Sequence, residues 1–260
     1  MGERTYETLR VEKRGAADWL SLDRPQALNA MNGRMIEELA DYFAARVTDR
    51  ETRVIVLRAS GPTFCAGLDL KEMSGLIAEL GTSDRLLFQQ RLSSIFLSMR
   101  RCPQPIVCLL QGAAAGGGFA LAVAADIRYC TPDARMSAAF IKVGLSGCDV
   151  GMSYLLPRAV GTSVATELLM TGAFLEAQRA LSLGFVSAIV PVEALEEAGE
   201  KAVAGLLQAD PLGLALTKQG LQVGIAAPSL DSAIANEDRQ QALLSGMDGF
   251  RSRLRAFIRK

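Results

Sequence analysis

Residues 106–130, IVCLLQGAAAGGGFALAVAADIRYC, already indicate the class of fold. The apolar run at 106–110 is typical of a strand that is buried on both faces. Three glycines at 116–118 and the small apolar residues that follow them predict a tight turn leading into a buried helix. The run at 127–130 predicts the next strand. A strand, a helix and a second strand in this order favour a layered α/β core.

The same stretch also has to be considered as a membrane span, because residues 105–125 carry no charge. A spanning helix needs about 20 strongly apolar residues. Gln111, the glycines and the many alanines keep the hydropathy of this stretch modest. We therefore expect no membrane association.

The alternation of strands and helices continues toward the N-terminus. Residues 6–22 alternate around a break at Arg14-Gly15 and predict a β-hairpin. Helical spacing of apolar residues over 31–47 predicts a helix, and the apolar run at 54–57 predicts another buried strand. Residues 72–100 are expected to be helical on both sides of a break.

The C-terminal third is expected to be helical. From residue 151 onward helical patterns dominate, and they are interrupted by glycines and prolines at Gly161, Gly172, Gly184, Pro191, Pro211 and Pro228. The tail over 250–260 holds five basic residues and no acid, which favours a solvated helix face. A site for ligand phosphates, or for a neighbouring subunit, is the alternative.

The composition excludes several classes of protein. The 260 residues hold 28 Lys and Arg against 28 Asp and Glu, and half of them are hydrophobic, which suits one large domain or a core with an appendage. Zero net charge offers no basic surface for a nucleic acid. The absence of histidine excludes a Ser-His-Asp triad and a histidine-ligated zinc. A catalytic base must therefore be Asp, Glu, Lys, Tyr or Cys.

The cysteines and the first residues favour a cytoplasmic protein. Five widely spaced cysteines without a CxxC pair are typical of free thiols, not of disulfides or a metal site; they are Cys65, Cys102, Cys108, Cys130 and Cys148. The opening segment MGERTYETLR carries charges where a signal peptide needs an apolar core.

Two loops are candidate sites. The first, Cys65-Ala66-Gly67-Leu68-Asp69, follows a predicted strand, and its glycine allows a ligand to approach the backbone. The second, Gly116-Gly117-Gly118, opens the predicted helix, whose free N–H groups suit an anion or a developing oxyanion. Two such donors on one oxygen would form an oxyanion hole. Glycine turns are common, and neither loop matches a GxGxxG fingerprint or a P-loop, so a purely structural role stays open.

Taken together, five segments resemble the enoyl-CoA hydratase/isomerase (crotonase) family. They occur in that family's order and spacing over essentially the whole chain; they are DRPQALNA at 23–30, FCAGLDL at 64–70, the glycine-rich stretch 112–125, Asp126-Ile127, and LPRAVG at 156–161. The resemblance implies an α/β crotonase (ClpP/crotonase-like) fold of repeated ββα units with a helical C-terminal region. It implies a core over 1–200, and a region over 201–260 that takes part in trimerisation and lines the CoA site.

The resemblance also implies an acyl-CoA thioester as ligand and a homotrimer or hexamer. The N–H groups of Leu68 and Gly117 would hold the thioester oxygen. The residues expected to line the substrate and CoA are Gln26, Ala27, Ala66, Gly67, Leu68, Asp69, Leu70, Lys71, Gly116, Gly117, Ala120, Phe140 and Ile141. Coenzyme A would belong to the substrate, and no separate cofactor is expected.

Three positions depart from the family pattern. Hydratases of the family place one glutamate three residues after the central glycine and a second twenty residues later, where this chain has Ala120 and Phe140. A positioned acid or base typically contributes about 10²–10⁴ in rate, so losing both predicts poor hydration. Gln26 also replaces a residue that is often basic in the family, which weakens one phosphate contact.

Asp149 is the carboxylate that would replace the missing pair. The segment LSGCDVG at 145–151 is similar to the dienoyl-CoA isomerase branch, in which an aspartate at this position is catalytic. Two further acids of that branch fall on Ala120 and Ile141 here. Asp149 would remove a proton alpha or gamma to the thioester carbonyl. Equally, an aspartate before a helix is among the commonest N-caps.

The neighbours of these residues are expected to play structural parts. Burial among Leu145, Cys148 and Val150 would raise the pKa of Asp149, and Cys148 itself is expected to be a small packed thiol. Asp126 is expected to be structural. Asp69 is expected to hold its turn, and Glu72 to lie at an exposed helix start.

We considered three functions in the light of these observations. The leading one is an enzyme of fatty-acid or related metabolism that acts on an enoyl or dienoyl CoA thioester, with isomerisation better supported than hydration. The alternative is an acyl-CoA-binding protein that lost its chemistry with the two glutamates. A ClpP-like hydrolase needs a Ser-His pair and is excluded by the absence of histidine.

Overall fold

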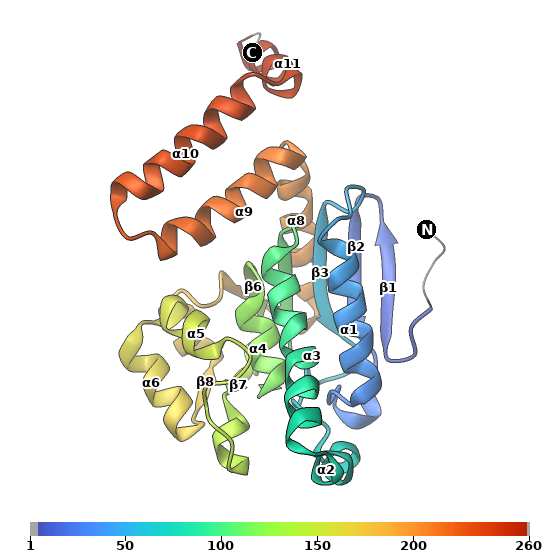
Figure 1. Ribbon diagram of the computed structural model, residues 1–260. Coiled ribbons are helices and arrows are strands. Elements are labelled where there is room, and N and C mark those ends of the chain that lie inside the picture. The colour runs from blue at the N-terminus through green and yellow to red at the C-terminus, as the bar shows by residue number, and fades with distance from the viewer. Residues whose placement is uncertain (1–4, 259–260) are drawn as a thin grey trace.

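A six-stranded sheet forms the centre of the fold (Figure 1). The computed structural model describes residues 5–258. The first two strands pair antiparallel and the rest are parallel, in the order β1 (Leu9–Arg14), β2 (Ala17–Leu22), β3 (Val54–Ala59), β4 (Ile106–Leu110), β6 (Ile127–Cys130) and β9 (Ala188–Ile189). The predicted hairpin and the three predicted strands are confirmed.

Helices cover both faces of this sheet. On one face lie α1 (Gly33–Arg46), α3 (Thr82–Arg101) and α4 (Gly117–Ala124), and on the other lies α8 (Leu195–Leu207). Alternate residues of β3 therefore enter two cores. Ile55 packs in the cluster with α1, α3 and α4, whereas Val54 packs in the cluster with α8. Burial on both faces explains why these strands are continuous apolar runs.

A second, three-stranded sheet supplies the short strands of the ββα units. Its order is β5 (Ala113–Ala115), β7 (Arg135–Ser137) and β8 (Phe174–Glu176). β4, β5 and α4 form one ββα unit, and β6 and β7 lead through the 3-10 turn η2 (Ala139–Val143) to α5 (Met152–Val160). The sequence pattern does not predict the second sheet, because strands of three residues are too short to show a period.

The C-terminal third is mainly helical, as predicted, with β8 and β9 as the exceptions. α9 lies between the core and α10, and α10 and α11 extend away from the sheet (Figure 1). The helices not yet named are α2 (Leu70–Glu79), α6 (Thr162–Thr171), α7 (Ala177–Ser182), α9 (Pro211–Ala226), α10 (Leu230–Ser245) and α11 (Asp248–Ile258), and two further 3-10 turns are η1 (Pro25–Ala27) and η3 (Val192–Ala194). Within the described residues, α10 has no buried side chain.

One buried lysine fastens α9 to the core. The Nζ of Lys218 donates to the carbonyl oxygens of Met99 (3.0 Å) and Gln104 (2.8 Å) and lies 2.9 Å from the Oδ2 of Asp126. Asp126 also accepts the N–H of Ile106 at 2.8 Å. This carboxylate therefore joins α9, the end of α4 and the start of β4, which confirms its structural role.

Two predicted helix boundaries were wrong by two residues. The helix predicted over 31–47 begins at Gly33, because the side chain of Asn32 caps it by accepting the N–H of Met35 at 3.0 Å. The helix predicted from Phe119 begins at Gly117, so two glycines lie inside its first turn. The predicted break between 72 and 100 is confirmed, since α2 ends at Glu79 and α3 begins at Thr82.

Within residues 5–258, no helix is long and apolar enough to cross a bilayer. Residues 1–4 of the N-terminal segment, and Arg259 and Lys260 of the basic tail, lie outside the described residues.

Candidate functional site

The two candidate loops lie against each other. The N–H of Cys65 donates to the carbonyl oxygen of Ala113 at 3.1 Å, and its carbonyl oxygen accepts the N–H of Ala115 at 2.9 Å. The first loop thus runs as a short parallel partner of β5. Loops that follow β3 and β4, about 50 residues apart in the chain, are joined by the ordinary hydrogen bonds of a parallel ladder.

Glycine is required where the loops approach most closely. Gly67 has a φ of +92°, and a Cβ there would lie 2.8 Å from the carbonyl oxygen of Ala115. At Gly118 a Cβ would lie 2.3 Å from the carbonyl oxygen of Cys65. Both separations are below any ordinary carbon–oxygen contact, so a side chain at either position would push the loops apart.

The position of Leu68 in a second bridge decides where its N–H points. Met31 forms a parallel bridge with Leu68, in which the N–H of Met31 donates to Gly67 (2.7 Å) and its carbonyl oxygen accepts the N–H of Asp69 (3.0 Å). In a parallel ladder the residue between these two partners directs its own N–H to the opposite side. The N–H of Leu68 therefore points away from Met31.

Gly117 offers the second donor. It is the first residue of α4, where the N–H has no intrahelical partner. The neighbouring N–H of Gly116 is occupied, because it donates to the carbonyl oxygen of Ser137 at 2.9 Å. Across the described residues, neither the N–H of Leu68 nor that of Gly117 donates to a protein acceptor. The dipole of α4 adds positive potential at this end of the helix.

The positions of the missing glutamates are apolar in the structure. Ala120 is buried within α4, and Phe140 and Ile141 are half-buried in η2. The ring of Phe140 borders the glycine loop, since a Cβ on Gly116 would lie 3.5 Å from its Cε1 atom. The structure therefore brings Gly67, Leu68, Gly116, Gly117 and Phe140 together.

The 26–27 segment and the start of α2 flank the first loop. The N–H of Ala66 donates to Leu28 at 3.0 Å, which places η1, with Gln26 and Ala27, next to the loop. Gln26, Leu70 and Lys71 are exposed. These residues border the site at the surface.

Asp69 holds the turn, as predicted. It caps α2 by accepting the N–H of Glu72 at 3.2 Å, and the guanidinium of Arg24 lies 3.0 Å from its Oδ2. Burial acts to raise the pKa of Asp69, but the hydrogen bonds from Arg24 and from the backbone of Glu72 and Lys71, with the positive charge of Arg24, together hold this pKa below its usual value. Glu72 lies in the exposed first turn of α2, as predicted. No local pattern indicates this role of Arg24, because its partner lies 45 residues away in the chain.

Asp149 lies beside α3 and does not cap a helix. The N-cap of α5 is Gly151, and the side chain of Asp149 instead accepts the N–H of Val150 at 2.8 Å and the Nε2 of Gln89 at 2.5 Å. The capping interpretation was therefore wrong. Burial raises the pKa of Asp149. No hydrogen bond within the described residues joins it to either loop.

Two expected neighbours of Asp149 do not bury it. Leu145 and Cys148 are exposed, so the prediction of a packed thiol at Cys148 was wrong. Val150 is buried, as expected. Gln89, on α3, supplies a contact that no local pattern indicates, because it is 60 residues away in the chain.

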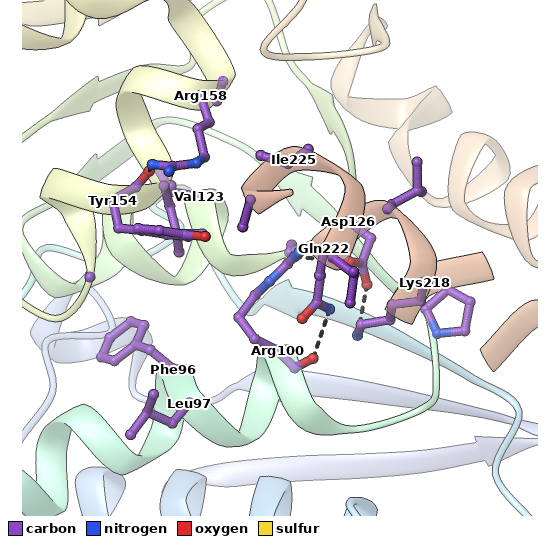
Figure 2. Close-up of a pocket in the computed structure, with 18 of the residues that line it drawn as sticks. Phe96, Leu97, Arg100, Val123, Asp126, Tyr154, Arg158, Lys218, Gln222 and Ile225 are labelled. Carbon is purple, nitrogen blue, oxygen red and sulfur yellow. Dashed lines mark hydrogen bonds and ion pairs between the residues drawn. The ribbon is translucent and has the colours of Figure 1, made fainter. Parts of the chain in front are cut away.

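A cavity with mainly apolar walls lies at the other end of α4 (Figure 2). It has a volume of about 1120 Å³ and lies between α3, α5 and α9, with apolar walls that include Phe96, Val123 and Ile225. Asp126 and Lys218 form an ion pair at its edge. None of the predicted site residues lines this cavity, although Val150, next to Asp149, does.

Repeated ββα units around a parallel sheet, with a glycine loop that opens a buried helix, define the crotonase fold. Comparison with a solved structure agrees: a putative enoyl-CoA hydratase from Streptomyces coelicolor superposes with a TM-score of 0.94 at 33% identity, covering 100% of this chain and 94% of that one. The chain belongs to the enoyl-CoA hydratase/isomerase family, whose model matches residues 13–260.

Two curated relatives show the range of named activities nearby. A probable enoyl-CoA hydratase of Mycobacterium bovis is 36% identical over 222 residues, which cover 84% of this chain and 78% of the relative. The human mitochondrial Delta(3,5)-Delta(2,4)-dienoyl-CoA isomerase is 32% identical over 229 residues, which cover 84% of this chain and 70% of the relative.

Proposed function

We propose that this protein is a cytoplasmic enzyme that shifts a double bond in an unsaturated acyl-CoA, an enoyl or dienoyl thioester of fatty-acid or related metabolism. The observation that carries the proposal is the pair of unpaired N–H groups, of Leu68 and Gly117, on two loops that lie against each other. Coenzyme A enters with the substrate, and the proton transfers proposed below need no resident cofactor.

The two N–H groups would act on the thioester oxygen. Removal of a proton next to a thioester, or at the end of its conjugated chain, places negative charge on that oxygen. Two fixed donors stabilise this charge without reorganising, and one such donor is commonly worth about 10²–10³ in rate. The residues that border the loops at the surface, Gln26, Ala27, Ala66 and Lys71, would line the path of CoA.

Asp149 would move the proton. Its carboxylate takes a proton from the carbon alpha or gamma to the carbonyl, and the electron pair passes into the enolate. The aspartic acid then returns the proton to the other end of the conjugated system, so the double bond shifts and no water is added. Burial raises the pKa of Asp149 and so makes it a stronger base than an exposed aspartate.

A protein that only binds acyl-CoA is the second candidate. Ala120 and Phe140 favour it, because they stand where hydratases of the family have glutamates, so neither position supplies a carboxylate for the addition of water. Such a protein would keep the two N–H donors and bind a thioester without turnover.

Turnover of 2-enoyl-, 3-enoyl- and 3,5-dienoyl-CoA by the full chain separates these functions. Chromatography of the products distinguishes isomers from the 3-hydroxy product, and calorimetry with acetoacetyl-CoA measures binding alone. We expect double-bond shift with little hydration. Tight binding with no turnover of any substrate would favour the binding protein, and rapid hydration would contradict the proposed chemistry.

The C-terminal helices would hold copies of this chain together as a homotrimer or hexamer. Apolar side chains are exposed along α10 and α11: Leu230, Ile234, Leu243, Met247, Phe250, Leu254 and Ile258. Such a row of exposed apolar residues, on helices with no buried side chain among the residues that the structure describes, is typical of a protein interface. This is the part that we propose for residues 201–260, together with lining the CoA site.

Light scattering is expected to give at least three times the 27.8 kDa of one chain. Leu243→Asp is expected to lower this mass, because it places a charge in the apolar row of α10. Gln241→Asp, two residues away on the same helix and also exposed, is the matched control and should leave the mass unchanged. A monomeric wild type would contradict the proposal.

A further inference from the structure

Both hydrogen bonds of the Asp149 carboxylate fall on one oxygen. Oδ1 accepts the Nε2 of Gln89 at 2.5 Å and the N–H of Val150 at 2.8 Å. Within the described residues no donor reaches Oδ2, and Asp149 has no ion-pair partner. The two oxygens of this half-buried carboxylate are therefore inequivalent: one is held and the other is free.

The backbone is strained at Val150, whose N–H is one of the two donors to Oδ1. Val150 has a φ of +40°, a conformation that is rare for any residue with a side chain and rarer still for a β-branched one. This conformation accompanies the donation of the Val150 N–H to the side chain of the preceding residue. Backbone strain of this kind persists only where the surrounding structure enforces it, and it concentrates at functional sites.

We propose that Gln89 is a positioning residue that, with the N–H of Val150, fixes the Asp149 carboxylate so that Oδ2 is the atom that accepts the substrate proton. The proposal rests on the proposed function above. The hydrogen bond that the carboxamide of Gln89 donates is stronger when Oδ1 carries negative charge, so it favours the ionised base. It also holds the carboxylate plane, which directs Oδ2.

Four cationic side chains on the elements around Asp149 contact other groups. On α3, Arg85 donates to the carbonyl oxygens of Ile77 and Ala78, and Arg91 pairs with Glu37 and Asp41; near and on α5, Lys142 lies over Phe174 and Arg158 lies over Tyr154. The thiol of Cys148 is exposed. The causes that act on the pKa of Asp149 are burial, which raises it, and the two hydrogen bonds, which lower it.

Gln89→Met tests the proposal, since methionine keeps the length and most of the volume but donates nothing. Gln90→Met, at the exposed neighbouring position on α3, is the matched control. A hydrogen bond to a charged group is worth enough to move the titration by about one pH unit. We expect the acid limb of the kcat profile to move that far toward higher pH, with roughly a tenfold loss of kcat below it and an unchanged KM.

A second readout does not depend on activity. The carboxyl ¹³C resonance of Asp149, assigned by its absence in Asp149→Asn, is titrated in wild type and in both methionine variants. A midpoint that rises in Gln89→Met alone supports the proposal. Equal midpoints in wild type and Gln89→Met would overturn it, and so would a fall in KM and kcat together without a moved limb. If wild type turns over no thioester, the proposed function fails while the titration still decides the role of Gln89.

Discussion

Asp149→Asn is expected to lower the rate of double-bond shift by at least about a hundredfold, because a positioned general base commonly contributes about 10²–10⁴ in rate. Asparagine has the same shape and still accepts the hydrogen bonds of Gln89 and Val150, but it cannot take a proton. Binding of acetoacetyl-CoA, measured by calorimetry, should be unchanged. Full activity in this variant would show that another group is the base.

The same variant has a clear expectation for stability. Because burial raises the pKa of Asp149 in the folded protein, the folded state binds the proton more readily than the unfolded chain does. Wild-type stability therefore falls as pH rises from the unfolded to the folded pKa, and the loss persists above it. Asp149→Asn avoids this loss, so its Tm at neutral pH should equal or exceed that of wild type, and the difference should shrink as the pH is lowered.

Activity, unlike stability, is expected to rise with pH through the pKa of Asp149. The base must be ionised to act, so a raised pKa places the acid limb of kcat above the pH at which an ordinary aspartate titrates. The chain has no histidine, so no imidazole titration overlaps this limb. Its absence in wild type would contradict a carboxylate base.

Gly118→Ala is expected to remove most of the activity and to destabilise the fold. The new methyl group would lie 2.3 Å from the carbonyl oxygen of Cys65 and 2.7 Å from its Cβ, so the first loop must move away from α4. Overpacking of this kind typically costs about 1–3 kcal/mol. A displacement of about 1 Å between groups that act on one atom costs about a hundredfold in rate. Chemical unfolding and kcat/KM measure the two effects.

Gly205→Ala is the matched control for that substitution. Gly205 also lies inside a helix, α8, and a Cβ there would meet no heavy atom within 4 Å. Alanine should therefore raise the free energy of unfolding by roughly 0.5–1 kcal/mol, through helix propensity alone, and leave kcat/KM unchanged. If Gly118→Ala keeps wild-type activity while it is destabilised, the contact between the loops is structural only.

Patterns that repeat along the chain made the architecture predictable. The strands β3 and β4 are largely buried on both faces and therefore appear as apolar runs, and the glycines before Phe119 signal the turn into α4. The strands of the second sheet escaped prediction, because three residues such as Ala113–Ala115 have no period. Their pairing depends on neighbours that are distant in sequence.

The site was predictable where one segment contains its own partners, and unpredictable elsewhere. Asp69 was predicted to hold its turn, and it does so by accepting the N–H of Glu72, only three residues away. Asp149 showed the limit: of its two alternative roles, the helix cap was wrong, and one of its partners, Gln89, belongs to another helix. The roles of Leu68 and Gly117 on substrate stay predictions.

The bridges at Cys65 and Leu68 have a consequence for how this chain tolerates insertions. The direction of each N–H in a ladder depends only on whether its residue number is odd or even relative to the bridge. One residue inserted between Cys65 and Leu68 would replace none of the residues of the site. It would nevertheless turn the donor of Leu68 toward Met31, whose carbonyl oxygen already holds the N–H of Asp69. Loop length at this point is therefore as strict a requirement as the identity of any catalytic side chain.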